Sequence, residues 1–200
     1  MHILITGASG LIGKPLIHAL EQRDYRISTL STRKRSAPVS TKIKTYHWSP
    51  SQGIFDEKAL DGVDAIISLA GAKINQRWTK KNRKAILDSR VKGTQLIQNA
   101  LKNNPNHNVT HFISASAIGL YPSDFDRTYK ESETKVANSF TGEVVAAWEQ
   151  QVDEIATLVR HVSKIRIGLV LAKSGGALVP LATPASFGLG AWFGSGKQWQ

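Results

Sequence analysis

The chain has 200 residues, no cysteine and a formal net charge of +11, from 26 Lys and Arg against 15 Asp and Glu. This length suits one main domain, and the lack of cysteine excludes a disulfide framework, a thiolate nucleophile and a cysteine-based metal site. Without a signal peptide or an apolar run of roughly 18 residues, we expect a cytoplasmic protein with no membrane partner. The basic residues are spread without interleaved aromatic residues, which argues against nucleic-acid binding and favours a solvated surface with a phosphate-handling site.

The first 13 residues, MHILITGASGLIG, predict a buried strand that turns directly into a helix. Gly7 would allow the tight turn, Gly10 would let backbone N–H groups approach a pyrophosphate, and Gly13 would let the helix lie close to the strand. The helix N-terminus adds partial positive charge. This stretch therefore predicts a dinucleotide site, with a purely structural glycine turn as the alternative.

A second strand is expected over residues 26–30, followed by the basic run STRKR at residues 31–35. A protein that binds NAD often carries an acidic residue here for the ribose 2′-hydroxyl, whereas this run has none. Guanidinium and ammonium groups suit a 2′-phosphate. The run thus favours NADP(H) over NAD(H), although NAD(H) stays possible, and the alternative is a basic surface loop.

The remaining elements alternate between strand and helix along the chain. We expect helices at about 11–23, 55–60, 79–104 and 140–152, strands at 42–48, 65–71 and 110–115, one interrupted strand over 158–171, and a long polar loop at 118–139. This alternation predicts an α/β fold, a Rossmann-like doubly wound parallel sheet with helices on both faces.

Two stretches are candidates for the ligand-facing edge of that sheet. Small residues end the strand at Leu69, Ala70 and Gly71, where a cofactor ribose could lie against the backbone. The loop that follows contains Arg77 and Trp78, and these residue types in a loop indicate either a role towards the substrate or surface exposure alone.

Metal catalysis and serine hydrolysis have little support in the sequence. His107 and His111 have the spacing of a metal pair, but they fall in a loop that leads into a strand, so we expect no metal site. The sequence also contains no GxSxG nucleophile elbow.

Five motifs together resemble the extended short-chain dehydrogenase/reductase superfamily, in particular its atypical branch of NAD-dependent epimerase/dehydratase-like proteins, often labelled nucleoside-diphosphate-sugar epimerases or cell-division inhibitors. The motifs are GASGLIG at 7–13, LAGAKINQRWT at 69–79, the Ser89–Arg90 pair within ILDSRVKGT, SASAIGLY at 114–121, and RIGLVLAKSGGAL followed by FGLGAWFGSGKQ. The resemblance covers nearly the whole chain.

The resemblance implies a set of cofactor-binding residues. It assigns the pyrophosphate to Gly7, Ser9, Gly10, Leu11 and Ile12, the 2′-phosphate to Arg33, and the adenosine side with the nearby ribose to Leu69, Ala70 and Gly71.

The resemblance also implies where catalysis would take place, and here the sequence departs from the superfamily. Ser116 falls at the position of the serine that hydrogen-bonds a substrate hydroxyl or carbonyl. The tyrosine and lysine of the usual proton-transfer pair would then be Phe140 and Val144, neither of which can transfer a proton. Tyr121 or a water molecule is the remaining proton donor that we expect.

Members of the family continue beyond the point where this chain stops, so the resemblance implies a C-terminally truncated substrate lobe. We expect a Rossmann domain at residues 1–172 and the beginning of a substrate-binding lobe at residues 173–200. The apolar stretch 185–192 would then be exposed, which makes a homodimer possible.

Two functions follow from this reading. The first is an NADP(H)-binding epimerase or oxidoreductase-like protein for a nucleotide-sugar or a small carbonyl or polyol substrate. The second is a catalytically silent binding or regulatory module that depends on NADP(H), which the loss of the tyrosine and lysine favours. The sequence leaves open whether the protein is an enzyme.

Overall fold

A seven-stranded sheet in the order β4-β3-β2-β1-β5-β6-β7 forms the centre of the molecule. The computed structural model describes residues 1–33, 43–173, 175–190 and 196. The strands are β1 (His2–Thr6), β2 (Arg26–Ser31), β3 (Lys44–Ser49), β4 (Ile54–Phe55), β5 (Ala65–Ser68), β6 (His111–Ala117) and β7 (His161–Ile167). All neighbouring strands pair in parallel except β3 and β4, which are antiparallel. The predicted α/β fold is confirmed.

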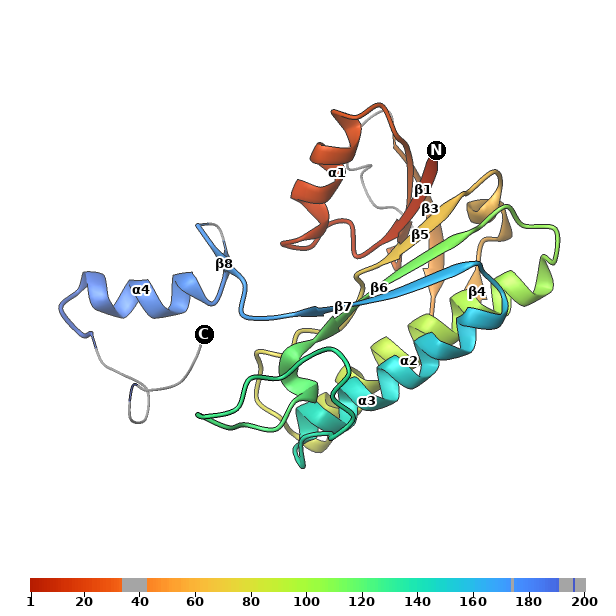
Figure 1. The fold of residues 1–200 in the computed structure, drawn as a ribbon. Coiled ribbons are helices and arrows are strands. Elements are labelled where there is room, and N and C mark those ends of the chain that lie inside the picture. The colour runs from red at the N-terminus through yellow and green to blue at the C-terminus, as the bar shows by residue number, and fades with distance from the viewer. Residues whose placement is uncertain (34–42, 174, 191–195, 197–200) are drawn as a thin grey trace.

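Helices cover both faces of this sheet (Figure 1). On one face α1 (Gly13–Glu21) buries Ile17 and Leu20 against apolar side chains of β1 and β2. On the other face α2 (Lys80–Asn103) and α3 (Phe140–Asp153) lie side by side. Their apolar residues form a larger core with those of β1, β3, β5 and β6.

The strand order reverses between β1 and β5, which are neighbours in the sheet. In an open parallel sheet this reversal leaves a crevice at the carboxyl ends of the strands, because the connections leave in opposite directions. Residues that follow Thr6 and Ser68 therefore lie beside one another, since these two residues are in register.

Several boundaries differ from the sequence-based expectations; the strand expected at 65–71, for example, ends at Ser68, so that 69–71 follow it. The expected helix at 55–60 is instead β4 followed by a 3-10 turn at Glu57–Leu60. The first helix ends at Glu21 rather than near residue 23. The interrupted strand expected over 158–171 is instead the shorter strand β7 at His161–Ile167, which has no break at Lys164 because that side chain pairs with a carboxylate of α3.

The C-terminal segment leaves the sheet after β7. A short hairpin of β8 (Leu171–Ala172) and β9 (Gly175–Gly176) leads into α4 (Leu178–Ser186), which has no buried residue and projects away from the sheet (Figure 1). The hairpin spans the predicted domain boundary after residue 172, which stays a prediction. Most of the motif FGLGAWFGSGKQ lies outside the described residues.

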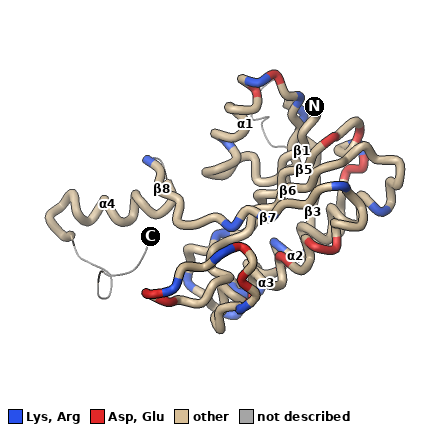
Figure 2. Tube along the Cα trace, in the orientation of Figure 1, with Lys and Arg blue, Asp and Glu red and all other residues tan. Residues whose placement is uncertain are grey.

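Lys and Arg are distributed over several elements rather than gathered on one (Figure 2). Within the described residues, no helix is both long and apolar enough to cross a membrane.

Candidate functional site

The turn after β1 has the close contacts that its glycines predict. Gly7 has φ +71°, and a Cβ on it would lie 2.8 Å from the carbonyl carbon of Leu69. A Cβ on Gly13 would lie 2.4 Å from the carbonyl oxygen of Gly7. These two positions therefore tolerate only glycine, one because of its backbone conformation and its contact with the β5 end, the other because α1 starts directly against the turn.

The N-terminus of α1 is free of side-chain capping. Its cap residue, Ile12, makes no side-chain cap hydrogen bond, and the first turn contains no acidic residue. The partial positive charge of this helix end is thus not neutralised by a capping or acidic side chain of the helix, and this condition suits a bound anion.

Thr6 fixes the second wall of the crevice. Its side chain is fully buried, and its Oγ1 accepts hydrogen bonds from the backbone N–H groups of Leu69 (3.1 Å) and Ala70 (3.0 Å). The segment after β5 is therefore held against the glycine turn after β1.

A cavity of about 880 Å³ opens between these walls. It brings together most of the residues predicted to bind the cofactor: Gly7, Ser9, Gly10, Arg33, Leu69, Ala70 and Gly71. Leu11 and Ile12, also predicted to bind the cofactor, belong to the same turn but do not line this cavity. The other end of the cavity is formed by β2, β3 and α2, through Thr29–Thr32, Thr45, Trp48, Ala85, Asp88, Ser89 and Lys92 among others.

Arg33 is exposed at the end of β2, on the wall of this cavity. Its backbone N–H donates to Ser31 Oγ at 3.2 Å, which shapes the turn after the strand. Lys34 and Arg35, the other basic residues of the predicted 2′-phosphate site, lie outside the described residues.

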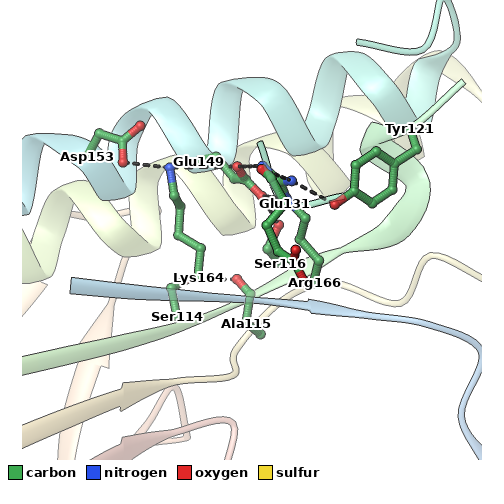
Figure 3. Close-up of polar contacts among 9 residues, drawn as sticks. All are labelled: Ser114, Ala115, Ser116, Tyr121, Glu131, Glu149, Asp153, Lys164 and Arg166. Atoms are coloured by element: carbon green, nitrogen blue, oxygen red, sulfur yellow. Dashed lines mark hydrogen bonds and ion pairs between the residues drawn. The ribbon is translucent and has the colours of Figure 1, made fainter. Parts of the chain in front are cut away.

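Ser116 and Tyr121 belong to one polar network, which Figure 3 shows. Ser116 Oγ donates to Glu149 Oε1 at 2.5 Å, Arg166 binds both carboxylate oxygens of Glu149 at 2.9 Å, and Arg166 Nη1 donates to the Tyr121 hydroxyl at 2.8 Å. Lys164 is 3.7 Å from the same carboxylate. The two predicted catalytic residues are therefore linked through an ion pair.

Glu149 and Arg166 are charged in this network. Burial raises the pKa of Glu149, but hydrogen bonds from Arg166 and Ser116 outweigh it, so that its pKa lies below the ordinary value. The hydrogen bond to Glu149 raises the pKa of Arg166. Because the proton of Ser116 is directed to a carboxylate, its oxygen is left as an acceptor, whereas Tyr121 receives a hydrogen bond and keeps its own proton to donate.

Sequence reasoning did not identify Glu149 and Arg166. A signal was present: Glu149 and Asp153 are one turn apart on a helix, and Lys164 and Arg166 share one face of the next strand. Only the packing of α3 on β7 shows that these pairs meet.

Phe140 and Val144 are part of the packing of α3. The Phe140 ring is half-buried, with the Trp78 ring 5.1 Å away in an edge-to-face arrangement and the Arg83 guanidinium 4.5 Å from its centroid. Val144 is 2% exposed within the core.

Trp78 itself is 46% exposed, and its Nε1 donates to the carbonyl oxygen of Ile74 at 3.0 Å, so the indole is held although it faces solvent. Arg77 is exposed beside it.

Comparisons with known proteins agree with this geometry. The model of the NAD dependent epimerase/dehydratase family matches residues 3–161. An epimerase family protein of Staphylococcus saprophyticus is 38% identical over 198 residues, which cover 99% of this chain and 65% of that protein. The chain thus spans a little under two thirds of the length of that curated relative.

Two solved structures extend the comparison. The human epimerase family protein SDR39U1, crystallised with NADPH, aligns with a TM-score of 0.80 and 27% identity over 99% of this chain and 64% of that chain. A nucleoside-diphosphate sugar epimerase from Corynebacterium glutamicum aligns with a TM-score of 0.74 and 28% identity over 98% of this chain and 39% of that chain. With its sheet order, its glycine turn and these matches, the chain belongs to the NAD dependent epimerase/dehydratase family.

Proposed function

We propose that this protein binds NADP(H) in the cavity between the glycine turn and the end of β5. The observation that carries this proposal is the cavity wall, in which Gly7 and Gly10 face Leu69–Gly71 and Arg33 lies at the end of β2. The crowding at Gly7 and Gly13 and the uncapped N-terminus of α1 fit a pyrophosphate. The human relative was crystallised with NADPH, which supports the same cofactor here.

Arg33 gives the preference for the phosphorylated cofactor. A guanidinium on this wall can bind a 2′-phosphate through charge-assisted hydrogen bonds, whereas the acidic residue that would bind a 2′-hydroxyl is missing from residues 31–35. NAD(H) would lack this contact.

The test is a fluorescence titration of the chain with NADPH and with NADH. We expect NADPH to bind at least about tenfold more tightly, and Arg33→Gln to remove most of this preference while leaving NADH affinity unchanged. An exposed arginine in the turn after α1, Arg23, is not on the cavity wall and gives the matched control Arg23→Gln. Equal affinity for the two cofactors would contradict the NADP(H) preference, and no binding of either would contradict the proposed function.

For the chemistry we propose an epimerase or oxidoreductase-like reaction on a nucleotide-sugar or a small carbonyl or polyol substrate. A bound nicotinamide would supply hydride transfer. Tyr121 is the proton donor in this proposal, because Arg166 orients its hydroxyl. Ser116 would accept a hydrogen bond from a substrate hydroxyl, because its own hydroxyl hydrogen is donated to the Glu149 carboxylate. For an oxidoreductase the readout is a substrate-dependent change in nicotinamide absorbance. For an epimerase, which returns the hydride to the substrate, the readout is conversion of the substrate to its epimer, and Tyr121→Phe should abolish either activity.

The second candidate is a catalytically silent module that binds NADP(H). It is favoured by Val144, which lies in the core where the resemblance places the catalytic lysine, and by Phe140, which has no proton to transfer. Tight NADPH binding without turnover on a panel of sugar nucleotides and carbonyl compounds, together with a partner protein recovered only when NADPH is present, would favour this candidate over the enzyme.

A further inference from the structure

The backbone of Ala72, on the wall of the cavity, is held at both polar groups by consecutive side chains of α2. Its N–H donates to Ser89 Oγ at 2.9 Å, and its carbonyl oxygen accepts a hydrogen bond from Arg90 Nη1 at 3.2 Å. Both side chains also donate to the carbonyl oxygen of Ile86, at 3.0 Å each. Two side chains of helix α2 therefore hold the backbone of this part of the wall in place.

The guanidinium of Arg90 also lies directly against Gly71. A Cβ on Gly71 would be 3.1 Å from Arg90 Cζ and 3.3 Å from each Nη. The Trp148 ring is 5.2 Å from the same guanidinium. Gly71 is itself on the wall of the cavity, so a single glycine separates the cation from the space that we propose for the cofactor.

Arg90 carries a charge that the described residues do not neutralise. Across those residues its hydrogen bonds go to backbone carbonyl groups, and none of its contacts is an ion pair with a carboxylate. Burial lowers the pKa of Arg90, which means that its surroundings disfavour the charged form. A desolvated cation without an anionic partner is costly, and an anion in the adjoining cavity would offset that cost.

We propose that Arg90, together with Ser89, is a positioning residue for the anionic dinucleotide: the pair holds the Gly71–Ala72 wall, and the charge of Arg90 favours an anion in the cavity. This inference rests on the proposed binding of NADP(H). It gives a role to the Ser89–Arg90 motif, which the proposed function does not use.

The experiment measures NADPH affinity of the full chain for the wild type, Arg90→Gln, Arg90→Lys and Ser89→Ala, at low and high salt. Adenosine, which is uncharged, is measured by its displacement of NADPH. We expect Arg90→Gln to weaken NADPH binding about tenfold, with a smaller factor at high salt and a change of no more than about twofold for adenosine. Arg90→Lys should recover part of the NADPH affinity because it keeps the charge.

Arg23→Gln removes the same charge from an exposed turn and serves as the matched control, with NADPH affinity unchanged. Ser89→Ala should weaken NADPH binding about threefold and speed the hydrogen exchange of the Ala72 amide, which loses its acceptor. This second variant removes no charge and little volume, so it keeps the test valid even where Arg90→Gln does not fold.

Three results would overturn the inference. The first is that Arg90→Gln binds NADPH as tightly as the wild type does. If Arg90→Gln does not fold, the equivalent result is wild-type NADPH affinity in both Arg90→Lys and Ser89→Ala. Another is an equal loss of NADPH and adenosine affinity in Arg90→Gln, which would show a structural role alone. The third is a wild-type chain that binds no NADPH, which would overturn the proposed function as well.

Discussion

Arg166 on β7 and Glu149 on α3 form a two-point ion pair, with Nε to Oε1 and Nη2 to Oε2 both at 2.9 Å. The Glu149 side chain is 8% exposed and that of Arg166 17%, so the pair is largely removed from water. Its further hydrogen bonds link it to Ser116, to Tyr121 and to the carbonyl oxygen of Glu131, so that β6, β7 and α3 share one network. The pair thus fixes both the packing of α3 and the hydroxyl groups at the carboxyl edge of the sheet.

Glu149→Ala is expected to lower the free energy of unfolding by about 3 kcal/mol, because it leaves Arg166 buried without its anion. Urea denaturation followed by circular dichroism gives the value. The control is Lys84→Ala, which removes an ion pair to Asp88 from an exposed side chain of α2 and should cost less than about 0.5 kcal/mol. A loss for Glu149→Ala as small as that of the control would show that the network does not stabilise the fold.

The buried ring of His2 predicts that the stability of the protein depends on pH. Burial, and then the nearby Arg26, lower the pKa of His2 below its ordinary value of 6.5. Its Nδ1 lies 3.2 Å from the carbonyl oxygen of Gly62 and its Nε2 lies 3.0 Å from Ser28 Oγ, which suits a neutral ring that donates to Gly62 and accepts from Ser28.

The unfolded chain therefore binds a proton at His2 at a higher pH than the folded chain does. The free energy of unfolding should fall as the pH drops below 6.5, until the folded-state pKa is also passed. His2→Gln should reduce this fall, measured from melting temperatures between pH 7 and pH 5. An identical pH profile in the variant would contradict the assignment of His2 as buried and neutral.

Gly13→Ala is expected to destabilise the protein by about 2 kcal/mol or more, because the new Cβ would meet the carbonyl oxygens of Gly7 at 2.4 Å and Ala8 at 2.8 Å. These are backbone atoms of the turn and cannot move alone. Gly93→Ala in α2 is the matched control, since its nearest neighbour, Trp48, would be at an ordinary 3.5 Å. Alanine favours helix over glycine, so this control should be neutral or stabilising by up to about 1 kcal/mol. Similar melting temperatures for the two variants would refute the close approach of α1.

Phe140 and Val144 are expected to differ in how much a polar substitution destabilises the protein. Val144→Lys would place an ammonium group at a position that is 2% exposed, and we expect a loss of several kcal/mol or a strongly lowered lysine pKa. Phe140→Tyr adds one hydroxyl to a half-buried ring and should fold with a melting temperature close to that of the wild type.

Thermal melts of the two single variants test this contrast. Val144→Lys with wild-type stability would show that the lysine position of the superfamily is still accessible. The gain of nicotinamide-linked turnover in Phe140→Tyr alone would show that the pocket needs only a proton donor.

The local pattern of the sequence determined much of the fold and the glycine-turn side of the cavity. The buried run at 2–6 and the glycines that follow predicted β1, the turn and α1, because strand burial and positive φ leave local signatures. The long helix expected over 79–104 is α2, and Thr79 caps its start, where the Thr79 side chain accepts a hydrogen bond from the N–H of Asn82 at 3.2 Å. The motifs also identified the family.

Tertiary structure decided the polar network and the support of the cavity wall. Glu149 and Arg166 are 17 residues apart, and Ala72 is 18 residues from Arg90. The spacing of these residues in the sequence does not show which of them meet, because the buried ion pair and the hydrogen bonds to the Ala72 backbone form only once α2 and α3 pack on the sheet. The glycine turn could be predicted from sequence alone since its constraint is local, whereas the residues that hold the opposite wall depend on contacts that only the folded chain makes.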